Sequence, residues 1–195
     1  MSAVNYPAGV LPPKQKGIKR KPKLSVAPGN RGMAFEDEIN QSNEYYVEKG
    51  LCLITKRPTP IKIVKVDYTH GPKITEAFFQ TQSTTDYNGV YRGRYIDFEA
   101  KSTRSLTSFP LSNIPVQQIE HLERVISQSG IAFFLINWAR KNETYLVPAK
   151  YIIDFYRSHP RSSIPYESMR ENGYLVKQGY RPRYDYLPII IEHLL

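Results

Sequence analysis

Hydrophobic residues recur along the chain with two different periods, and each period predicts a different kind of element. Between Asn30, a favourable helix N-cap, and Gly50, a favourable helix end, apolar positions follow the repeat of a helix. The acidic residues 36–38 then fall in its first two turns, where the helix dipole favours negative charge. The residues that recur at helical spacing are Phe35, Ile39, Tyr46 and Val47.

Shorter apolar runs alternate with further helical patterns in the rest of the chain. Strands are predicted at 51–55, 61–66, 74–79, 131–137 and 144–147. An amphipathic helix is predicted from Ile114 to Ile126, ending before Gly130, and further helices at 151–157 and 189–195. Because strands and helices are interspersed, the fold class is α/β or α+β.

One more strand, from Tyr95, alternates regularly between two faces. One face carries Ile96, Phe98 and Ala100, and the other carries Tyr95, Asp97, Glu99 and Lys101. We expect Asn88-Gly89 to form the tight turn of a hairpin that leads into this strand.

Residues 56–82 are predicted to project from the rest of the molecule. They open with Lys56-Arg57-Pro58-Thr59-Pro60, which is too rich in proline for a central strand and reads as a rigid bend carrying two cations. Two predicted strands follow. We therefore expect a basic hairpin or stalk.

The charge of the chain points to a polyanionic partner. The formal net charge is +9, and residues 1–30 contain no acidic residue and several prolines and glycines. We interpret 1–30 as a flexible basic arm and 31–195 as one domain. The alternatives are that the charge serves solubility alone and that the arm is a tail without a role. The cations that the arm offers to phosphates include Lys19, Arg20, Lys21 and Lys23.

Several classes of protein are disfavoured. The one cysteine, Cys52, excludes an intrachain disulfide and any multi-thiolate metal site, and the four histidines lack metal-ligand spacing. There is no glycine-rich phosphate loop with a lysine. Without a signal peptide or a long apolar run, we expect a soluble cytoplasmic protein with no membrane partner.

Two carboxylates and an ammonium group are predicted to meet on the alternating strand. Glu99 and Lys101 project to the same side, and Asp86 lies upstream, where the chain can fold back beside Glu99. Adjacent carboxylates repel each other unless a cation separates them, and Mg²⁺ held there activates water for phosphodiester hydrolysis. Taken separately, however, Glu-x-Lys fits an exposed ion pair and Asp86 fits a turn.

Several blocks of sequence indicate a particular family of nucleases. They resemble, in order, those of the RecU family of bacterial Holliday-junction resolvases, which belong to the restriction-endonuclease-like nucleases. The resemblance spans roughly residues 30–190. The blocks are Asn30-Arg31-Gly32-Met33, Lys56-Arg57-Pro58-Thr59-Pro60, Ser83-Thr84-Thr85-Asp86-Tyr87-Asn88-Gly89, Gly93-Arg94-Tyr95-Ile96-Asp97-Phe98-Glu99-Ala100-Lys101, Thr107-Ser108-Phe109-Pro110-Leu111 and Gln118-Ile119-Glu120-His121.

The resemblance implies an α/β fold of the restriction-endonuclease type, with a mixed central sheet flanked by helices and a stalk at about 56–82. It implies catalytic roles for Asp86, Glu99 and Lys101, and metal ligation by Thr84, Asp86, Glu99 and Gln118. The implied cofactor is Mg²⁺, for which Mn²⁺ can substitute. Glu36 is a candidate supporting residue from the first helix. Besides the arm, the residues expected to contact DNA are Arg31, Lys56, Arg57, Arg94 and Arg104.

The implied activity is that of a homodimeric endonuclease that makes paired nicks across a four-way junction during recombination and repair, at the nucleoid. A recombinase and a branch-migration helicase are the expected protein partners. Three alternatives stay open: a non-catalytic protein that binds or anneals DNA, an endonuclease of the same fold that cuts linear duplex at a sequence, and an interaction protein that regulates a recombinase.

Overall fold

The computed structural model describes residues 28–80, 84–159 and 162–195, so most of the predicted basic arm lies outside the described residues. Helix α1 spans Pro28–Glu48. It begins before the predicted cap, Asn30, and inside the range expected for the arm. The acidic residues 36–38 therefore lie in its middle, and the expected stabilisation by the helix dipole is wrong, because that effect is confined to the first turn. The helix ends at the predicted place, where Gly50 adopts a left-handed φ of 63°.

A six-stranded sheet forms the centre of the molecule, in the order β1-β4-β5-β7-β8-β10. Strands β5 and β7 are parallel and all other neighbours are antiparallel, so the sheet is mixed. The strands are β1 (Leu53–Lys56), β4 (Tyr87–Tyr91), β5 (Arg94–Thr103), β7 (Ile131–Trp138), β8 (Glu143–Pro148) and β10 (Tyr174–Leu175).

The turn between β4 and β5 is not where the sequence predicted it. Arg92 and Gly93 make the turn, with φ values of 45° and 81°. Asn88 and Gly89 instead lie inside β4, opposite Thr55 and Ile54 of β1. A Cβ at Gly89 would lie 2.1 Å from the carbonyl oxygen of Leu53. The glycine is therefore explained by the close approach of two strands and not by a turn.

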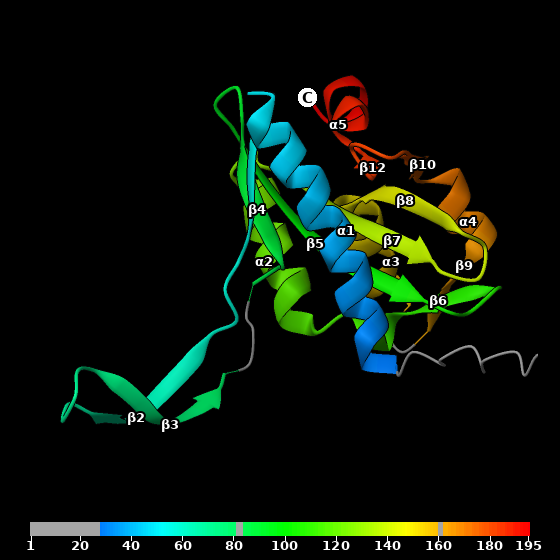
Figure 1. Ribbon diagram of the computed structural model, residues 1–195. Coiled ribbons are helices and arrows are strands. Elements are labelled where there is room, and N and C mark those ends of the chain that lie inside the picture. The colour runs from blue at the N-terminus through cyan, green and yellow to red at the C-terminus, as the bar shows by residue number, and fades with distance from the viewer. Residues whose placement is uncertain (1–27, 81–83, 160–161) are drawn as a thin grey trace, which may run out of the picture.

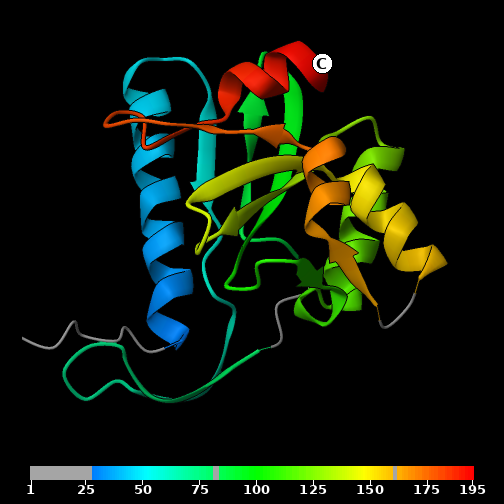
Figure 2. The ribbon, with the colours of Figure 1, turned by 90° about the vertical axis from the view of Figure 1, so that its right-hand side faces the viewer.

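Helices cover both faces of the sheet (Figures 1 and 2). Helix α1 and the C-terminal helix α5 (Leu187–His193) pack on one face, around a stack in which the ring of Phe98 lies between Tyr87 and Phe133. Helices α2 (Val116–Ser127) and α3 (Ala149–Ser158) pack on the other. The predicted class, α/β with a mixed central sheet flanked by helices, is confirmed.

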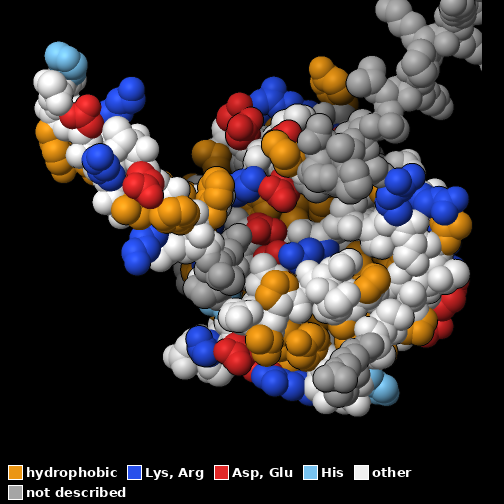
Figure 3. All heavy atoms as spheres, turned by 90° about the horizontal axis from the view of Figure 1, so that it is seen from below, with side chains coloured by type: hydrophobic (Ala, Val, Ile, Leu, Met, Phe, Trp, Pro, Cys, Tyr) orange, Lys and Arg blue, Asp and Glu red, His pale blue; other side chains and the backbone are white. Residues whose placement is uncertain are grey.

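A two-stranded hairpin extends away from this body. Strands β2 (Ile61–Asp67) and β3 (Lys73–Phe79) pair with each other in a sheet of their own, and almost every residue in them is exposed. Figure 3 shows the hairpin standing off from the body, with hydrophobic, basic and acidic side chains on its surface. Its exposed apolar side chains include Ile61, Ile63, Val64, Ile74, Phe78 and Phe79.

Short elements complete the fold beside the second layer and at the C-terminal end. Strands β6 (Ser108–Pro110) and β9 (Ser163–Pro165) pair near a 3₁₀ turn at Leu111–Asn113, and β11 (Lys177–Gln178) pairs with β12 (Tyr184–Asp185). Helix α4 spans Tyr166–Glu171. Among residues 28–80, 84–159 and 162–195, no helix has the length and apolar character needed to cross a membrane.

Candidate functional site

The alternation predicted for β5 is present and separates core residues from candidate site residues. Ile96, Phe98 and Ala100 are buried in the layer formed by α1 and α5. Asp97 and Glu99 point to the opposite face, beneath α2, and are almost fully buried, with exposed fractions of 0% and 1%. Buried carboxylates are costly unless partners stabilise them, so the contacts of these two side chains indicate what this face does.

Asp86 lies directly beside Glu99. The backbone nitrogen of Asp86 donates to Oε2 of Glu99 at 3.1 Å, and Oδ2 of Asp86 accepts from the backbone nitrogen of Ala100 at 3.4 Å. The pairing of β4 with β5 explains this proximity, because Tyr87, the next residue, lies opposite Phe98. Two carboxylates from different segments thus meet at one edge of the β4–β5 hairpin.

Lys101 is the nearest counter-charge to Glu99. Its Nζ lies 2.5 Å from Oε1 of Glu99, and it is only partly exposed. Burial, and next the neighbouring carboxylate of Asp86, raise the pKa of Glu99 to about 8, although the ammonium group of Lys101 opposes the rise. The ammonium group of Lys101 therefore does not fully offset the cost of charging this buried carboxylate. A further cation beside Glu99 would lower that cost.

Gln118 approaches the same region from α2. Helix α2 connects the parallel strands β5 and β7, and in such a crossover the helix runs antiparallel to the strands. His121 contacts Asp97, so Gln118, one turn earlier on the helix, lies toward Glu99, two residues further along β5. Gln118 is only 4% exposed.

Two buried oxygen atoms fit a hard cation. Among the described residues, Oε1 of Gln118 has no hydrogen-bond partner, and Oε1 of Glu99 has only its ion pair with Lys101. No group of three or more histidine, cysteine, aspartate and glutamate side chains suited to a metal is found in the part of the chain that is described. A metal here would therefore use two carboxylates and neutral oxygens, a ligand set that suits Mg²⁺ better than zinc or copper.

Two other predicted site residues lie at the margin. Thr84, half-buried, precedes Thr85 and Asp86 in the segment that leads to β4. Glu36 pairs with Lys56, whose Nζ lies 2.6 Å from its Oε2, and its backbone oxygen accepts from the hydroxyl of Tyr87. The carboxylate of Glu36 is thus occupied by Lys56, itself predicted to contact DNA.

The predicted DNA contacts are found in different environments. Arg94 and Arg104 are exposed, and Arg94 donates to the backbone oxygen of Ser129. Arg57 instead points inward, and its side chain is only 17% exposed. The side chain of Arg31 and the arm residues Lys19, Arg20, Lys21 and Lys23 lie outside the described residues.

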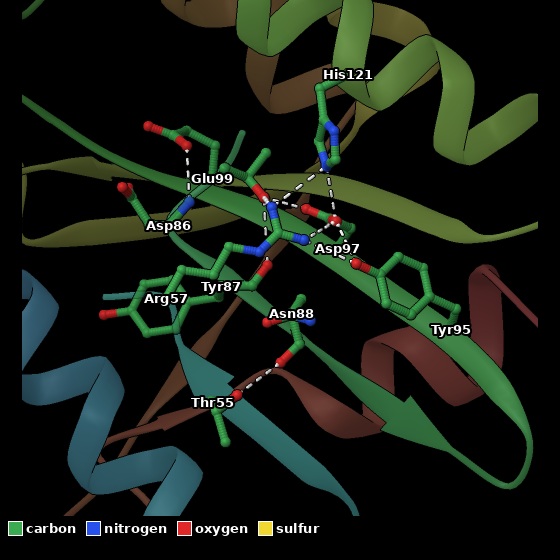
Figure 4. A network of polar contacts seen from close by, with 10 residues as sticks. Thr55, Arg57, Asp86, Tyr87, Asn88, Tyr95, Asp97, Glu99 and His121 are labelled. Carbon is green, nitrogen blue, oxygen red and sulfur yellow. Dashed lines mark hydrogen bonds and ion pairs between the residues drawn. The ribbon is translucent and has the colours of Figure 1, made fainter. Parts of the chain in front are cut away.

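Arg57 belongs to a buried polar network that the sequence did not reveal (Figure 4). Its Nη2 donates to Oδ2 of Asp97 at 2.6 Å and to the hydroxyl of Tyr95 at 2.7 Å. The same carboxylate receives the hydroxyl of Tyr95 at 2.8 Å, Nε2 of His121 at 2.8 Å and the hydroxyl of Thr85. The strand alternation, which puts Asp97 on the face of Glu99, was the available signal for this network.

Comparisons with known proteins agree with the resemblance in the sequence. The family model of RecU, described as Recombination protein U, matches residues 30–192. The chain is 49% identical over 205 residues to the Holliday junction resolvase RecU of Lactococcus lactis subsp. lactis (strain IL1403), covering 96% of both chains. It is 47% identical over 195 residues to the Holliday junction resolvase RecU of Streptococcus gordonii, covering 98% of this chain and 96% of the relative.

A solved structure, that of the Holliday junction resolvase Hjc from Archaeoglobus fulgidus, is similar over 72% of this chain and 93% of the archaeal one, with a TM-score of 0.42 and 13% identity. The family assignment depends on the sequence matches alone, which span almost the whole chain at nearly half identity. On these matches, the chain belongs to the RecU family.

Proposed function

We propose that this protein is a Mg²⁺-dependent endodeoxyribonuclease that resolves four-way DNA junctions by paired, symmetric nicks. The observation that carries the proposal is that Asp86 lies against the buried carboxylate of Glu99, beside Lys101. The relatives of this chain are named Holliday junction resolvases. The raised pKa of Glu99 marks a site that lacks positive charge. This is the electrostatic condition under which a divalent cation binds favourably.

The side chains divide the work as follows. Asp86, Glu99 and the amide oxygen of Gln118 hold the cation, and Thr84 completes the ligand set. When bound, Mg²⁺ supplies the positive charge that activates water and offsets the charge developing on the phosphate. Lys101, fixed against Glu99, adds a second positive charge at the rim and stabilises that developing charge from the protein side. Because Glu99 lies in β5 and Asp86 directly precedes β4, which pairs with β5, their spacing is set before the substrate arrives.

The substrate is recognised mainly by its charge and its branched shape. In this proposal, Arg94, Arg104 and the cations of the basic arm bind phosphates, and the hairpin β2–β3 enters the branch point as a stalk. A homodimer, in which one nuclease unit of residues 31–195 serves each of two opposed strands, matches the near-twofold symmetry of a junction. We propose cytoplasmic action at the nucleoid, beside a recombinase and a branch-migration helicase, with Mn²⁺ as an alternative metal.

The test is nicking of a synthetic four-way junction, with and without Mg²⁺, by the full chain and by Asp86→Ala. We expect symmetric nicks only when the metal is present and Asp86 is intact. Without metal, the junction affinity of the variant should stay within about twofold of that of the wild type. Binding without nicking in Mg²⁺ or Mn²⁺ would instead identify a non-catalytic DNA-binding protein. Equal cleavage of a linear duplex of the same sequence would identify a duplex-specific enzyme.

A further inference from the structure

The inward position of Arg57 brings together every element that carries a proposed metal ligand. Its guanidinium group contacts Asp97 on β5, Thr85 in the segment before β4, and His121 on α2, where Nη1 lies 3.4 Å from both Oγ1 of Thr85 and Nε2 of His121. None of these contacts is with a proposed ligand itself.

Three partners of Arg57 are close neighbours, along the sequence, of a proposed metal ligand. Thr85 precedes Asp86, and Asp97 lies two residues before Glu99 on the same face of β5. His121 lies one turn after Gln118 on α2. A displacement of the guanidinium group would therefore shift all three ligand-bearing segments relative to one another, which is the way outer residues tune a metal site.

The backbone of Arg57 also contacts the segment that carries Asp86. Its nitrogen donates to the carbonyl oxygen of Asp86 at 2.8 Å. Arg57 directly follows β1 and begins the proline-rich link that leads into the hairpin β2–β3. The peptide that carries a proposed metal ligand is thus fixed to the base of the projecting hairpin.

The chemistry of the network favours arginine in particular. Asp97 is fully buried and accepts four donors, of which only Arg57 carries a fixed positive charge. The planar fork of a guanidinium group serves several acceptors at once, whereas the ammonium group of a lysine is a point charge. A residue free to bind DNA phosphate would not be held by a buried carboxylate in this way.

We propose that Arg57 is a positioning residue for the metal site, which aligns Asp86, Glu99 and Gln118 through Thr85, Asp97 and His121, in place of the DNA contact predicted from the sequence. This inference rests on the proposed function, because it concerns the metal that the nuclease uses. It predicts that Arg57 controls the affinity for metal and not the affinity for DNA.

The decisive variant is Arg57→Lys, which keeps the charge and removes the fork. The stabilisation of the full chain by Mg²⁺ alone is followed by thermal unfolding, and junction binding is measured in EDTA over a range of salt concentrations. We expect the half-saturating Mg²⁺ concentration to rise by about 10-fold or more, as for other outer residues of metal sites. The melting temperature in EDTA should fall with the lost hydrogen bonds of the fork, whereas the junction affinity and its salt slope should match those of the wild type.

A phosphate ligand would behave in the opposite way. The proposal is overturned if Arg57→Lys leaves the Mg²⁺ midpoint unchanged, or if Arg57→Gln lowers the salt slope of junction binding by about one while that midpoint is kept. Arg157→Lys is the matched control, since Arg157 forms a similar two-bond fork with Glu123 on the surface, and its Mg²⁺ midpoint should not move.

A second variant guards against unfolding caused by an unpaired buried charge. Arg57→Gln combined with Asp97→Asn removes both charges while keeping polar side chains at both positions, and it should raise the Mg²⁺ midpoint as Arg57→Lys does. If the wild type itself shows neither stabilisation by Mg²⁺ nor nicking, the proposed function fails and the inference with it. If the wild type shows both and the Arg57 variants match it, only the inference fails.

Discussion

At the scale of single residues, the site is defined by charge that is buried without full compensation. Glu99 is buried beside Asp86, and Lys101 offsets only part of the cost. Gln118 adds a buried oxygen that has no hydrogen-bond partner among the described residues. Each of these features is unfavourable in a purely structural role, and a bound divalent cation relieves all of them together.

Glu99→Gln is predicted to change the pH dependence of stability in the absence of metal. The carboxyl titrates near 4.5 when unfolded and near 8 when folded, so the folded state binds more protons between these values. Its contribution is full at low pH and is lost as the pH rises through the folded value. Urea unfolding in EDTA from about pH 5 to about pH 9 should therefore show wild-type stability falling relative to Glu99→Gln. Parallel curves would contradict this account.

Lys101→Met is predicted to separate binding from nicking. The variant loses the ammonium group at the rim and keeps most of the apolar side-chain volume. We expect nicking under saturating Mg²⁺ to slow by about 10²–10³-fold, the usual cost of one preorganised electrostatic contact. Junction affinity in EDTA, measured by fluorescence anisotropy, should stay within about twofold of the wild type. A nicking rate near that of the wild type would exclude the role given to Lys101.

The sequence was informative about Glu99 and Lys101 because strand alternation is a local property, and about Asp86 because the chain before this strand folds back beside it. It was uninformative about Arg57, which looked like an exposed cation in a proline-rich link. Its burial depends on Asp97 and His121, which lie 40 and 64 residues away and are joined to it only in the folded chain. Contacts of this kind carry no local signature.

At the scale of elements, the β4–β5 hairpin places the site and β1 supports it. The longer strands and helices were predicted within a few residues, because their hydrophobic periods are clear. Strand β4, helix α4 and the short strands β6, β9, β10, β11 and β12 were not predicted. The turn was misplaced because Asn-Gly is a strong turn signal, while here Gly89 is needed where β1 crosses close to β4. The start of α1 was misplaced because Asn30 resembles a cap that the helix does not use.

Gly89→Ala is predicted to destabilise the sheet. The new methyl group would meet the backbone oxygen of Leu53 and the Cα and Cγ1 atoms of Ile54, and the paired backbone cannot move aside as the end of a flexible side chain could. We expect a loss of about 1–3 kcal/mol in the free energy of unfolding, typical of forced overpacking. The control is Val90→Ala, at the exposed next position of β4, which should stay within about 0.5 kcal/mol. Equal stabilities would refute this explanation of the glycine.

Replacing residues 61–79 with a short glycine–serine turn is predicted to leave the body folded. Strands β2 and β3 pair only with each other, so little of the main core depends on them. If the hairpin acts as a stalk, the ratio of nicking on a four-way junction to cleavage of a linear duplex should fall by about 10-fold or more, equal to at least about 1.4 kcal/mol. An unchanged ratio, with an unchanged melting temperature, would show that the hairpin does not select branched DNA.

At the scale of the whole molecule, the two faces of the sheet differ in role. One face, packed by α1 and α5, is a hydrophobic core, while the other combines a second core with the candidate metal site and the network around Arg57. The link to the hairpin begins directly after β1, beside that site, where the backbone nitrogen of Arg57 donates to the carbonyl oxygen of Asp86. Together with a net charge of +9, this arrangement suits a protein that binds DNA over a wide surface and has one catalytic site per chain.

The most direct test of this account is to locate Mn²⁺ in crystals of the protein by anomalous scattering. We predict a peak bounded by oxygen atoms of Asp86, Glu99 and Gln118, at distances of roughly 2.0–2.3 Å. The peak should be absent from crystals of Asp86→Ala grown under the same conditions. A metal bound elsewhere, or no peak while these side chains keep the positions described here, would contradict the proposed metal site and the nuclease mechanism built on it.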